Sequence, residues 1–225
     1  MNEASTLALV PAYNEAQRIT PVIAGALQYL PVLVVDDGSR DETVGVAEAA
    51  GATVLRQIPN QGKGAALRAG LRWGLERGYD AVLTLDADGQ HDPAEIPGFL
   101  ARRAAAPSDL LIGSRDFSQM PLVRRTANTL GRWSFSWALG QRVEDNQSGY
   151  RLLSRRMAEA VLDSQEHGFE FEVEMIVTCV QRGYTLDWLP IRTIYGDQSS
   201  HIDPWTHTRN WVRIVRQTRR AMHTR

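Results

Sequence analysis

The stretch Val32-Leu-Val-Val-Asp-Asp-Gly-Ser-Arg-Asp-Glu-Thr43 decides the fold class of this chain. Its first four residues are apolar, which predicts a short buried strand that ends at Asp36 and Asp37. Ser39 and Glu42 stand three residues apart, as in a capping box, and predict a helix that continues through Ala50. A buried strand followed by a polar turn and a helix is the repeating unit of proteins with a parallel sheet.

The same unit recurs along the chain. Upstream, Thr6 to Val10 predicts a strand and Glu15 to Leu30 predicts a helix. Downstream, the pattern predicts a strand near Thr53 to Arg56, a helix from about Gly64 to Glu76, a strand from Asp80 to Leu85, a helix from Pro93, a strand from Asp109 to Gly113, a regular segment from Tyr150 to Leu153, a helix from about Glu172 to Arg182 and a strand near Leu186 to Ile191. We therefore expect an α/β fold with a mostly parallel central sheet and helices on both faces.

Length and composition limit the classes of function. With 225 residues, 43% of them apolar, the chain is expected to form one domain with an ordinary core. A net charge of −1 and a pI near 6.5 give no general attraction to nucleic acid. The single cysteine, Cys179, lies among apolar residues and is expected in the core. No segment approaches the roughly 20 apolar residues of a membrane span. We expect the protein in the cytoplasm, or peripherally at the cytoplasmic face of the membrane.

Polar, turn-forming clusters follow three of the predicted strands. They run from Pro11 to Glu15, from Asp36 to Ser39 and from Asp86 to Asp92. Because ligands bind at the carboxyl ends of strands in open α/β sheets, we expect all three clusters to line one binding edge.

Asp86 and Asp88 are candidate metal ligands. In an extended backbone, side chains two residues apart project to the same side, so both carboxylates can approach one cation. Oxygen ligands suit Mg²⁺ or Mn²⁺, and Gln90 can supply a third oxygen. The alternative is a pair of solvated loop carboxylates. A divalent ion here would neutralise the negative charge of a diphosphate leaving group.

Lys63 and Arg115 are candidates to assist that metal. Lys63 lies between Gly62 and Gly64, where the backbone can approach an anion at the start of a helix. The loop matches neither a P-loop nor a complete dinucleotide fingerprint. Of the adjacent Asp36 and Asp37, we expect one to bind a ribose or base and the other to cap the turn. Tyr13 is a candidate to stack on a base.

With these residues placed, the chain resembles the family 2 glycosyltransferases, within them the branch of dolichol-phosphate mannose synthase and related polyprenyl-phosphate glycosyltransferases. Six pieces match in order across about two thirds of the chain: Val10-Pro-Ala-Tyr-Asn-Glu15, Val35-Asp-Asp-Gly-Ser-Arg-Asp-Glu-Thr43, Asn60-Gln-Gly-Lys-Gly-Ala-Ala-Leu67, Asp86-Ala-Asp-Gly-Gln-His-Asp-Pro93, Gly113-Ser-Arg115 and Asp145-Asn-Gln-Ser-Gly-Tyr-Arg151. The chain departs from the branch at Gly89, where an apolar residue is usual.

The resemblance implies a glycosyltransferase-A fold, with a Rossmann-like nucleotide-binding half at about 1–115 and an acceptor half at about 116–225. It implies a nucleoside diphosphate sugar donor and Mg²⁺ or Mn²⁺ held by Asp86, Asp88 and Gln90. The residues expected around the donor are Pro11, Ala12, Tyr13, Glu15, Asp36, Asp37, Lys63, Asp86 and Ala87. In the lipid-phosphate branch, Arg115 and Arg132 would bind the acceptor phosphate, and the segment with Tyr195, Ser200 and His201 resembles the branch's lid.

Two basic stretches are candidates for contact with a membrane surface. From Phe117 to Val143 there is no acidic residue, and arginines accompany Leu130, Trp133 and Trp137 at helical spacing. The segment from Trp205 onwards is also free of acid, with arginines along one predicted face. The alternative is ordinary amphipathic helices packed on the sheet. We do not expect nucleic acid as a partner, because apolar residues interrupt both stretches in helical register.

The expected reaction is displacement at the anomeric carbon of the sugar with inversion of its configuration. An acceptor lipid phosphate arrives ionised and needs no strong base, whereas for a hydroxyl acceptor Asp145 is the candidate base. Asp86, Asp88, Arg115 and Asp145 are therefore the candidate catalytic residues. The alternatives are a sugar nucleotidyltransferase, which lacks support because no basic triphosphate loop follows the first strand, and a binding protein without turnover. The base, the sugar and the oligomeric state stay open.

Overall fold

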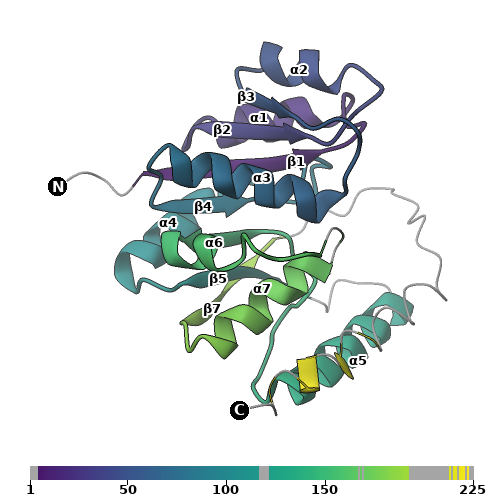
Figure 1. The fold of residues 1–225 in the computed structure, drawn as a ribbon, viewed down its shortest axis with the longest axis vertical. Coiled ribbons are helices and arrows are strands. Elements are labelled where there is room, and N and C mark those ends of the chain that lie inside the picture. The colour runs from purple at the N-terminus through teal and green to yellow at the C-terminus, as the bar shows by residue number, and fades with distance from the viewer. Residues whose placement is uncertain are drawn as a thin grey trace.

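The computed structural model describes residues 5–116, 122–166, 168, 170–192, 213, 215, 216, 218–220 and 222. Within these residues a seven-stranded sheet forms the centre of the molecule, in the order β3-β2-β1-β4-β6-β5-β7 (Figure 1). Its strands are β1 (Thr6–Ala12), β2 (Val32–Asp36), β3 (Thr53–Arg56), β4 (Ala81–Thr84), β5 (Leu110–Arg115), β6 (Arg151–Ser154) and β7 (Leu186–Ile191). Strands β3, β2, β1 and β4 are parallel, as are β5 and β7, whereas β6 runs antiparallel to both of its neighbours. The prediction of a mostly parallel sheet is confirmed.

Helices connect the strands. They are α1 (Ile19–Ala26), α2 (Thr43–Ala49), α3 (Lys63–Glu76), the 3₁₀ turn η1 (Pro93–Glu95), α4 (Ile96–Ala105), α5 (Leu122–Leu139), α6 (Arg155–Ala160) and α7 (Glu170–Gln181). In Figure 1, α3, α6 and α7 lie in front of the sheet, and α5 lies at one corner beside the last described residues. No helix among the described residues is both long enough and apolar enough to cross a membrane.

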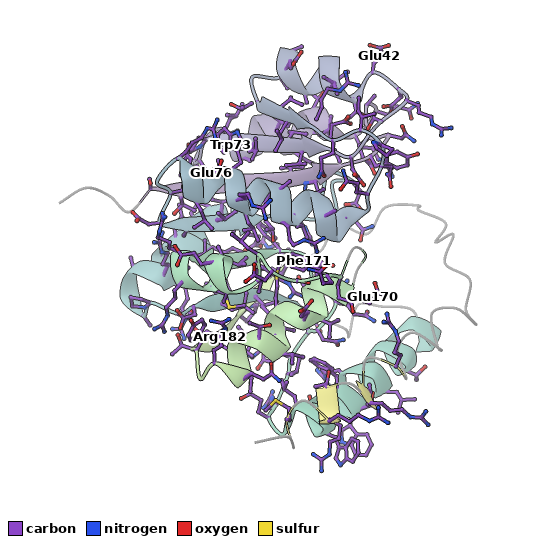
Figure 2. The ribbon with its side chains drawn as sticks, in the orientation of Figure 1. Glu42, Trp73, Glu76, Glu170, Phe171 and Arg182 are labelled. Carbon is purple, nitrogen blue, oxygen red and sulfur yellow. The ribbon has the colours of Figure 1, made fainter. Side chains whose placement is uncertain are left out.

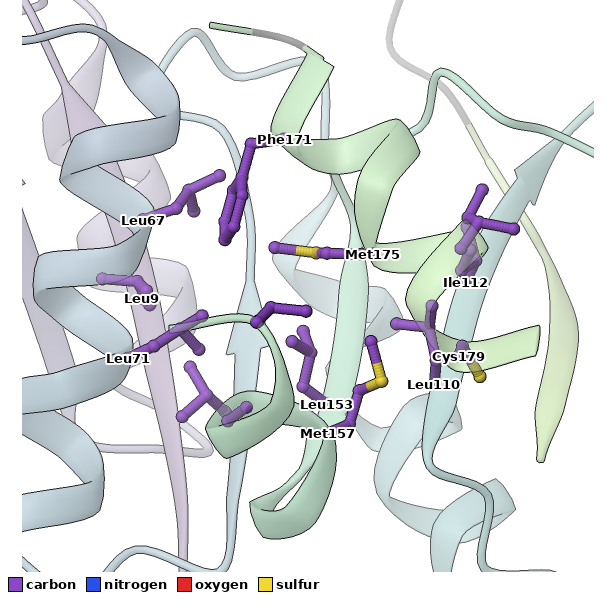
Figure 3. Packing of buried hydrophobic residues seen from close by; sticks show 14 of the residues in the cluster. Leu9, Leu67, Leu71, Leu110, Ile112, Leu153, Met157, Phe171, Met175 and Cys179 are labelled. Carbon is purple, nitrogen blue, oxygen red and sulfur yellow. The ribbon is translucent and has the colours of Figure 1, made fainter. Parts of the chain in front are cut away.

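Two apolar layers fill the spaces between the sheet and its helices. Alternate residues of β1 supply both layers, because successive side chains of a strand point to opposite faces. Leu7 and Leu9 pack with α3, α6 and α7, while Ala8 and Val10 pack with α1 and the start of α4. Figure 3 shows the first layer, where Leu67 of α3 and Phe171 of α7 point toward each other. Cys179 is buried in this layer, as predicted. Charged side chains such as Glu76 and Arg182 lie on the outside (Figure 2).

The capping box predicted at Ser39 is wrong. Helix α2 begins four residues later, at Thr43, and no side chain caps it. Ser39 instead accepts a hydrogen bond from the backbone N–H of Asn14 through its hydroxyl, at 2.9 Å. The same loop contact shortens the helix predicted from Glu15, because Asn14 adopts a left-handed backbone (φ 56°) and accepts a hydrogen bond from Arg40 N–H. Loop-to-loop bonding therefore replaces helix in both places.

Candidate active site

The carboxyl ends of β1, β2 and β4 surround a cavity of about 320 Å³. This is the edge that the three polar clusters predict. Its lining combines residues from the first strand end, the loop before α3 and the loop after β4: Pro11, Ala12, Tyr13, Glu15, Asp37, Asn60, Gly62, Lys63, Ala66, Asp86, Ala87 and Asp88. Most of the residues predicted for the donor and the metal therefore face one space.

The two aspartates at the end of β2 both hold loops. Asp37 accepts hydrogen bonds from the backbone N–H groups of Gln61 (2.8 Å) and Gly62 (2.7 Å), one on each carboxylate oxygen. Asp36 is buried and accepts a hydrogen bond from Ser39 N–H at 3.3 Å. Asp36 thus caps the turn, as expected of one of the pair. Asp37 fixes the loop that presents Lys63 to the cavity, and at the same time lines that cavity.

Lys63 links carboxylates from distant parts of the chain. Its Nζ lies 2.6 Å from Asp86 Oδ1 and 3.2 Å from Glu172 Oε1, at the start of α7. Burial opposes ionisation of Asp86, but Lys63, with a smaller contribution from Arg115, outweighs it and lowers the pKa of the Asp86 carboxyl to about 2. Burial also disfavours the charged ammonium, yet the two carboxylates raise the pKa of Lys63. Lys63 and Asp86 are therefore both ionised at neutral pH.

Gly149 makes this cluster possible. A Cβ at this position would lie 2.8 Å from Glu172 Oε1 and 3.0 Å from Asp86 Oδ2. Any side chain here would push the carboxylates away from Lys63, so the backbone must approach them closely. The motif from Asp145 to Arg151 therefore needs glycine at position 149, because the carboxylates of Asp86 and Glu172 occupy the space that a side chain would take.

His91 supports the loop that carries both candidate metal ligands. Its Nδ1 accepts a hydrogen bond from the backbone N–H of Asp86 at 2.9 Å, and its ring stacks on Tyr150. Burial lowers the pKa of His91 below its usual value, despite the nearby Asp86 carboxylate. Because the accepting Nδ1 carries no proton, the ring is neutral and has its proton on Nε2. His91 therefore positions Asp86 through the backbone.

The two aspartates after β4 fit a hard divalent cation. Asp88 Oδ1 accepts a hydrogen bond from Gln90 N–H at 3.0 Å, and both aspartates line the cavity. Among the described residues, no three or more His, Cys, Asp or Glu side chains gather as a metal cluster. Mg²⁺ commonly uses only one or two carboxylates and completes its shell with water and substrate phosphates. The donor set of Asp86 and Asp88 therefore suits a metal that arrives with a diphosphate, although Asp86 is also paired with Lys63.

Arg115 and Asp145 form a two-pronged ion pair. Arg115 Nε lies 2.6 Å from Asp145 Oδ2, and its Nη2 lies 3.0 Å from Oδ1. Asp145 is fully buried and also accepts hydrogen bonds from the backbone N–H groups of Arg115 and Gln147. Both carboxylate oxygens are thus occupied by donors. This geometry suits a residue that holds Arg115 in place better than a base that must receive a proton.

Arg151 locks the loop that carries Asp145. Its guanidinium is fully buried and donates to the backbone carbonyls of Ser148 (2.7 Å), Asn146 (3.3 Å) and Glu172. Burial lowers the pKa of Arg151, but nearby carboxylates of Glu172, Asp145 and Asp86 act in the opposite direction. Arg151 thereby joins this loop to the first turn of α7.

None of the five predicted acceptor residues lines this cavity among the described residues. Arg132 lies on α5, and Arg115 is not part of the cavity lining. Tyr195, Ser200 and His201 lie outside the described residues. Sequence reasoning missed Glu172, His91 and Arg151. His91 and Arg151 belong to matching motifs, which was an available signal, whereas nothing near Glu172 in the sequence distinguishes it from an ordinary helix carboxylate.

The sequence profile of glycosyl transferase family 2 matches residues 8–161. The chain belongs to this family. Among its relatives, an undecaprenyl-phosphate mannosyltransferase of Micrococcus luteus is 34% identical over 203 residues, 82% of each protein. A polyprenol monophosphomannose synthase of Mycolicibacterium smegmatis is 32% identical over 209 residues, 83% of this chain and 76% of the relative.

Solved structures agree with the family. Glucosyl-3-phosphoglycerate synthase from Mycobacterium tuberculosis, solved in complex with UDP, has a TM-score of 0.76 to this glycosyltransferase over 96% of this chain and 80% of its own. Their sequence identity is 19%, so the likeness concerns the fold alone. The predicted family 2 membership, glycosyltransferase-A fold and glycosyltransferase activity are confirmed.

Proposed function

We propose that this glycosyltransferase moves a sugar from a nucleoside diphosphate donor to a polyprenyl phosphate, with inversion at the anomeric carbon. The observation that carries the proposal is the pairing of Asp145 with Arg115. A hydroxyl acceptor needs a base, and the candidate base has both oxygens occupied by a guanidinium. An ionised phosphate needs no base and benefits from a fixed arginine nearby. Two relatives, an undecaprenyl-phosphate mannosyltransferase and a polyprenol monophosphomannose synthase, support this acceptor class.

The cavity is suited to a donor diphosphate. Lys63 opens helix α3, whose N-terminus favours negative charge, and its ammonium faces the same cavity. Asp37 fixes the preceding loop, so the backbone at Gly62 and the Lys63 side chain keep their places when a ligand enters. Lys63 would then stabilise the nucleoside diphosphate as it leaves. Tyr13, Glu15 and Ala12 lie where the nucleoside would bind.

Asp88 and Asp86 would hold a divalent cation, and Gln90 N–H keeps the Asp88 carboxylate in place. The ion would supply Lewis-acid stabilisation of the diphosphate. A structure with the same fold was solved with Mn²⁺ and UDP-glucose, which supports Mn²⁺ as a first metal to test. Mg²⁺ is the second.

The test is transfer of labelled sugar into polyprenyl phosphate. Purified protein would be incubated with Mn²⁺ or Mg²⁺ and a panel of UDP and GDP sugars, and label in the organic phase counted. We expect label from one donor, and a loss of at least about 100-fold in Asp88→Ala. Asp163→Ala, which removes an exposed carboxylate after α6, is the matched control and should keep full activity. Transfer only to hydroxyl acceptors, or full activity in Asp88→Ala, would contradict the proposal.

A further inference from the structure

Helix α5 exposes a stripe of large apolar side chains. Leu130, Trp133 and Trp137 are 66%, 69% and 56% exposed, more than most large apolar residues among those described. Their spacing of three and four residues places them on one side of the helix. We call these three residues the tryptophan face. Exposed apolar patches of this kind on a folded protein commonly mark a binding surface.

Among the described residues, the opposite side of α5 packs on the core. Phe135, Ala138 and Leu139 are buried, and Phe135 and Leu139 belong to the main apolar layer. At 100° per residue, these positions lie nearly opposite the tryptophan face. Helix α5 therefore carries two apolar sides, of which the core uses one.

A positive charge lies beside the tryptophan face, and further arginines lie near it in the sequence. The Arg219 guanidinium lies 4.6 Å from the centroid of the Trp137 ring, and Arg216 and Arg220 are exposed nearby in sequence. Ten of the chain's 25 lysines and arginines lie within residues 117–143 and 205–225, which contain no aspartate or glutamate. The remaining residues carry 15 basic and 26 acidic side chains. Basic residues are thus concentrated in two stretches of the sequence, although the net charge of the chain is −1.

We propose that the tryptophan face docks on an anionic lipid bilayer. Tryptophan rings settle at the boundary between headgroups and acyl chains, and flanking arginines bind anionic headgroups while their stems cover apolar surface. A second copy of this chain fits less well, because a two-fold contact would bring the same arginines of both copies together. Nucleic acid could bind the arginines, but it offers no apolar surface that would cover Leu130 and the two tryptophans.

Docking would act on the active site through a short connection. The backbone N–H of Val143 donates to the Ser136 hydroxyl at 3.0 Å, which ties the end of α5 to the loop after it. Two residues further, Asp145 binds Arg115. The membrane-facing helix and the arginine proposed to bind the acceptor phosphate are therefore joined by ordered structure. The docking itself does not depend on which acceptor the enzyme uses.

The test is co-sedimentation of the full chain with vesicles that contain no polyprenyl phosphate. Vesicles of phosphatidylcholine alone would be compared with vesicles holding a quarter phosphatidylglycerol. We expect binding to the anionic vesicles, weakening with added salt, and a blue shift of tryptophan fluorescence. The double variant Trp133→Ala, Trp137→Ala should bind at least about tenfold more weakly, while Trp133→Phe should keep most binding.

Charge reversal provides the second arm. Arg216→Glu with Arg220→Glu should weaken binding by at least about tenfold. Arg72→Glu with Arg182→Glu, the same change on exposed residues in α3 and directly after α7, should have little effect. Parent-like binding by the double tryptophan variant would overturn the proposal. The proposal would also be overturned if the protein did not bind vesicles and instead formed dimers, or bound single-stranded RNA, through the tryptophan face. Since no acceptor is present, this result is independent of the transfer assay.

Discussion

At the scale of single residues, Lys63 shows how the two halves of the sequence meet in one charge cluster. It pairs with Asp86 after β4 and with Glu172 of α7. Glu172 is buried, so it offers Lys63 a carboxylate that stays in place when a metal or a diphosphate competes for Asp86. We interpret Glu172 as a positioning residue for Lys63.

We expect Glu172→Gln to lower the free energy of unfolding by about 1–3 kcal/mol, because the half-buried Lys63 ammonium loses one of its two charged partners. Urea unfolding followed by circular dichroism measures this. Glu159→Gln removes an exposed partner of Arg155 and should change stability by less than about 0.5 kcal/mol. Equal stability of both variants would show that Asp86 alone satisfies Lys63.

Asp145 gives a second residue-scale prediction. If it holds Arg115 for a phosphate acceptor, Asp145→Asn should raise the KM for polyprenyl phosphate by about tenfold and change kcat less, because ground-state binding is weakened. Steady-state kinetics over a range of acceptor concentrations separates the two constants. A large fall in kcat together with loss of an ionisation from the pH–rate profile would instead assign Asp145 as a base.

At the scale of elements, Asp109, directly before β5, binds Ser154 at the end of β6 and Thr185 directly before β7. Its carboxylate accepts hydrogen bonds from the Ser154 hydroxyl (3.0 Å), from the backbone N–H (2.9 Å) and hydroxyl (2.8 Å) of Thr185, and from Arg156. These contacts hold β5, β6 and β7 in register. Burial acts against ionisation of Asp109, but Arg156 and the other donors lower its pKa well below the usual range.

We expect Asp109→Asn to destabilise the protein by about 1–3 kcal/mol. The substitution replaces one accepting carboxylate oxygen with an NH₂ group, which then faces the donors that this oxygen bound. The matched control is Asp187→Asn. It removes the ion pair with Arg102, which is partly exposed and therefore screened by water, and should lower the free energy of unfolding by less than about 0.5 kcal/mol. Thermal and urea unfolding of the two variants provide the comparison. A larger loss in the control would contradict the role given to Asp109.

Much of this element order can be predicted from sequence because buried strands are short apolar runs. The bounds of β3 and β7 were predicted to the residue, and the polar turns after β1, β2 and β4 do meet at one edge. The antiparallel direction of β6 was not predictable, since nothing in Arg151 to Ser154 encodes which neighbours it pairs with. The short helix α6, which Ser154 caps, was not predicted either, because six residues are too few to show a helical pattern in the sequence.

The candidate site divides in the same way. Asp86, Asp88 and Lys63 could be predicted because each lies in a turn directly after a strand or before a helix. Glu172 and the pairing of Asp145 with Arg115 could not, because both depend on contacts between segments 30 or more residues apart. Local patterns locate the site, and tertiary contacts decide which residue does what within it.

At the scale of the whole molecule, Asp86 and Asp109, each paired with a cation, make the stability of the fold depend on pH. In the folded protein the pKa of Asp86 is about 2, and that of Asp109 is also lowered, compared with about 4 in an unfolded chain. The unfolded state therefore binds more protons as the pH falls from about 5 to 2. The stabilisation is complete above this range and is lost within it.

Urea unfolding at pH 6, 5, 4 and 3 should accordingly show a steady fall in the free energy of unfolding below about pH 5. Asp109→Asn should make this fall shallower, because one of the shifted carboxyls is gone. An unchanged slope in the variant would mean that Asp109 does not titrate with folding. Measurements at fixed ionic strength keep screening of exposed charges constant.

The position of β6 has a consequence for how the protein is made. It lies between β4 and β5 and is the strand that bonds the two parts of the sheet together, yet it leaves the ribosome after both of them. Until residues 151–154 emerge, the nascent chain has two open strand edges in what becomes the middle of the protein. Open edges recruit strands from other chains, so this interval is when the growing polypeptide most needs protection from aggregation.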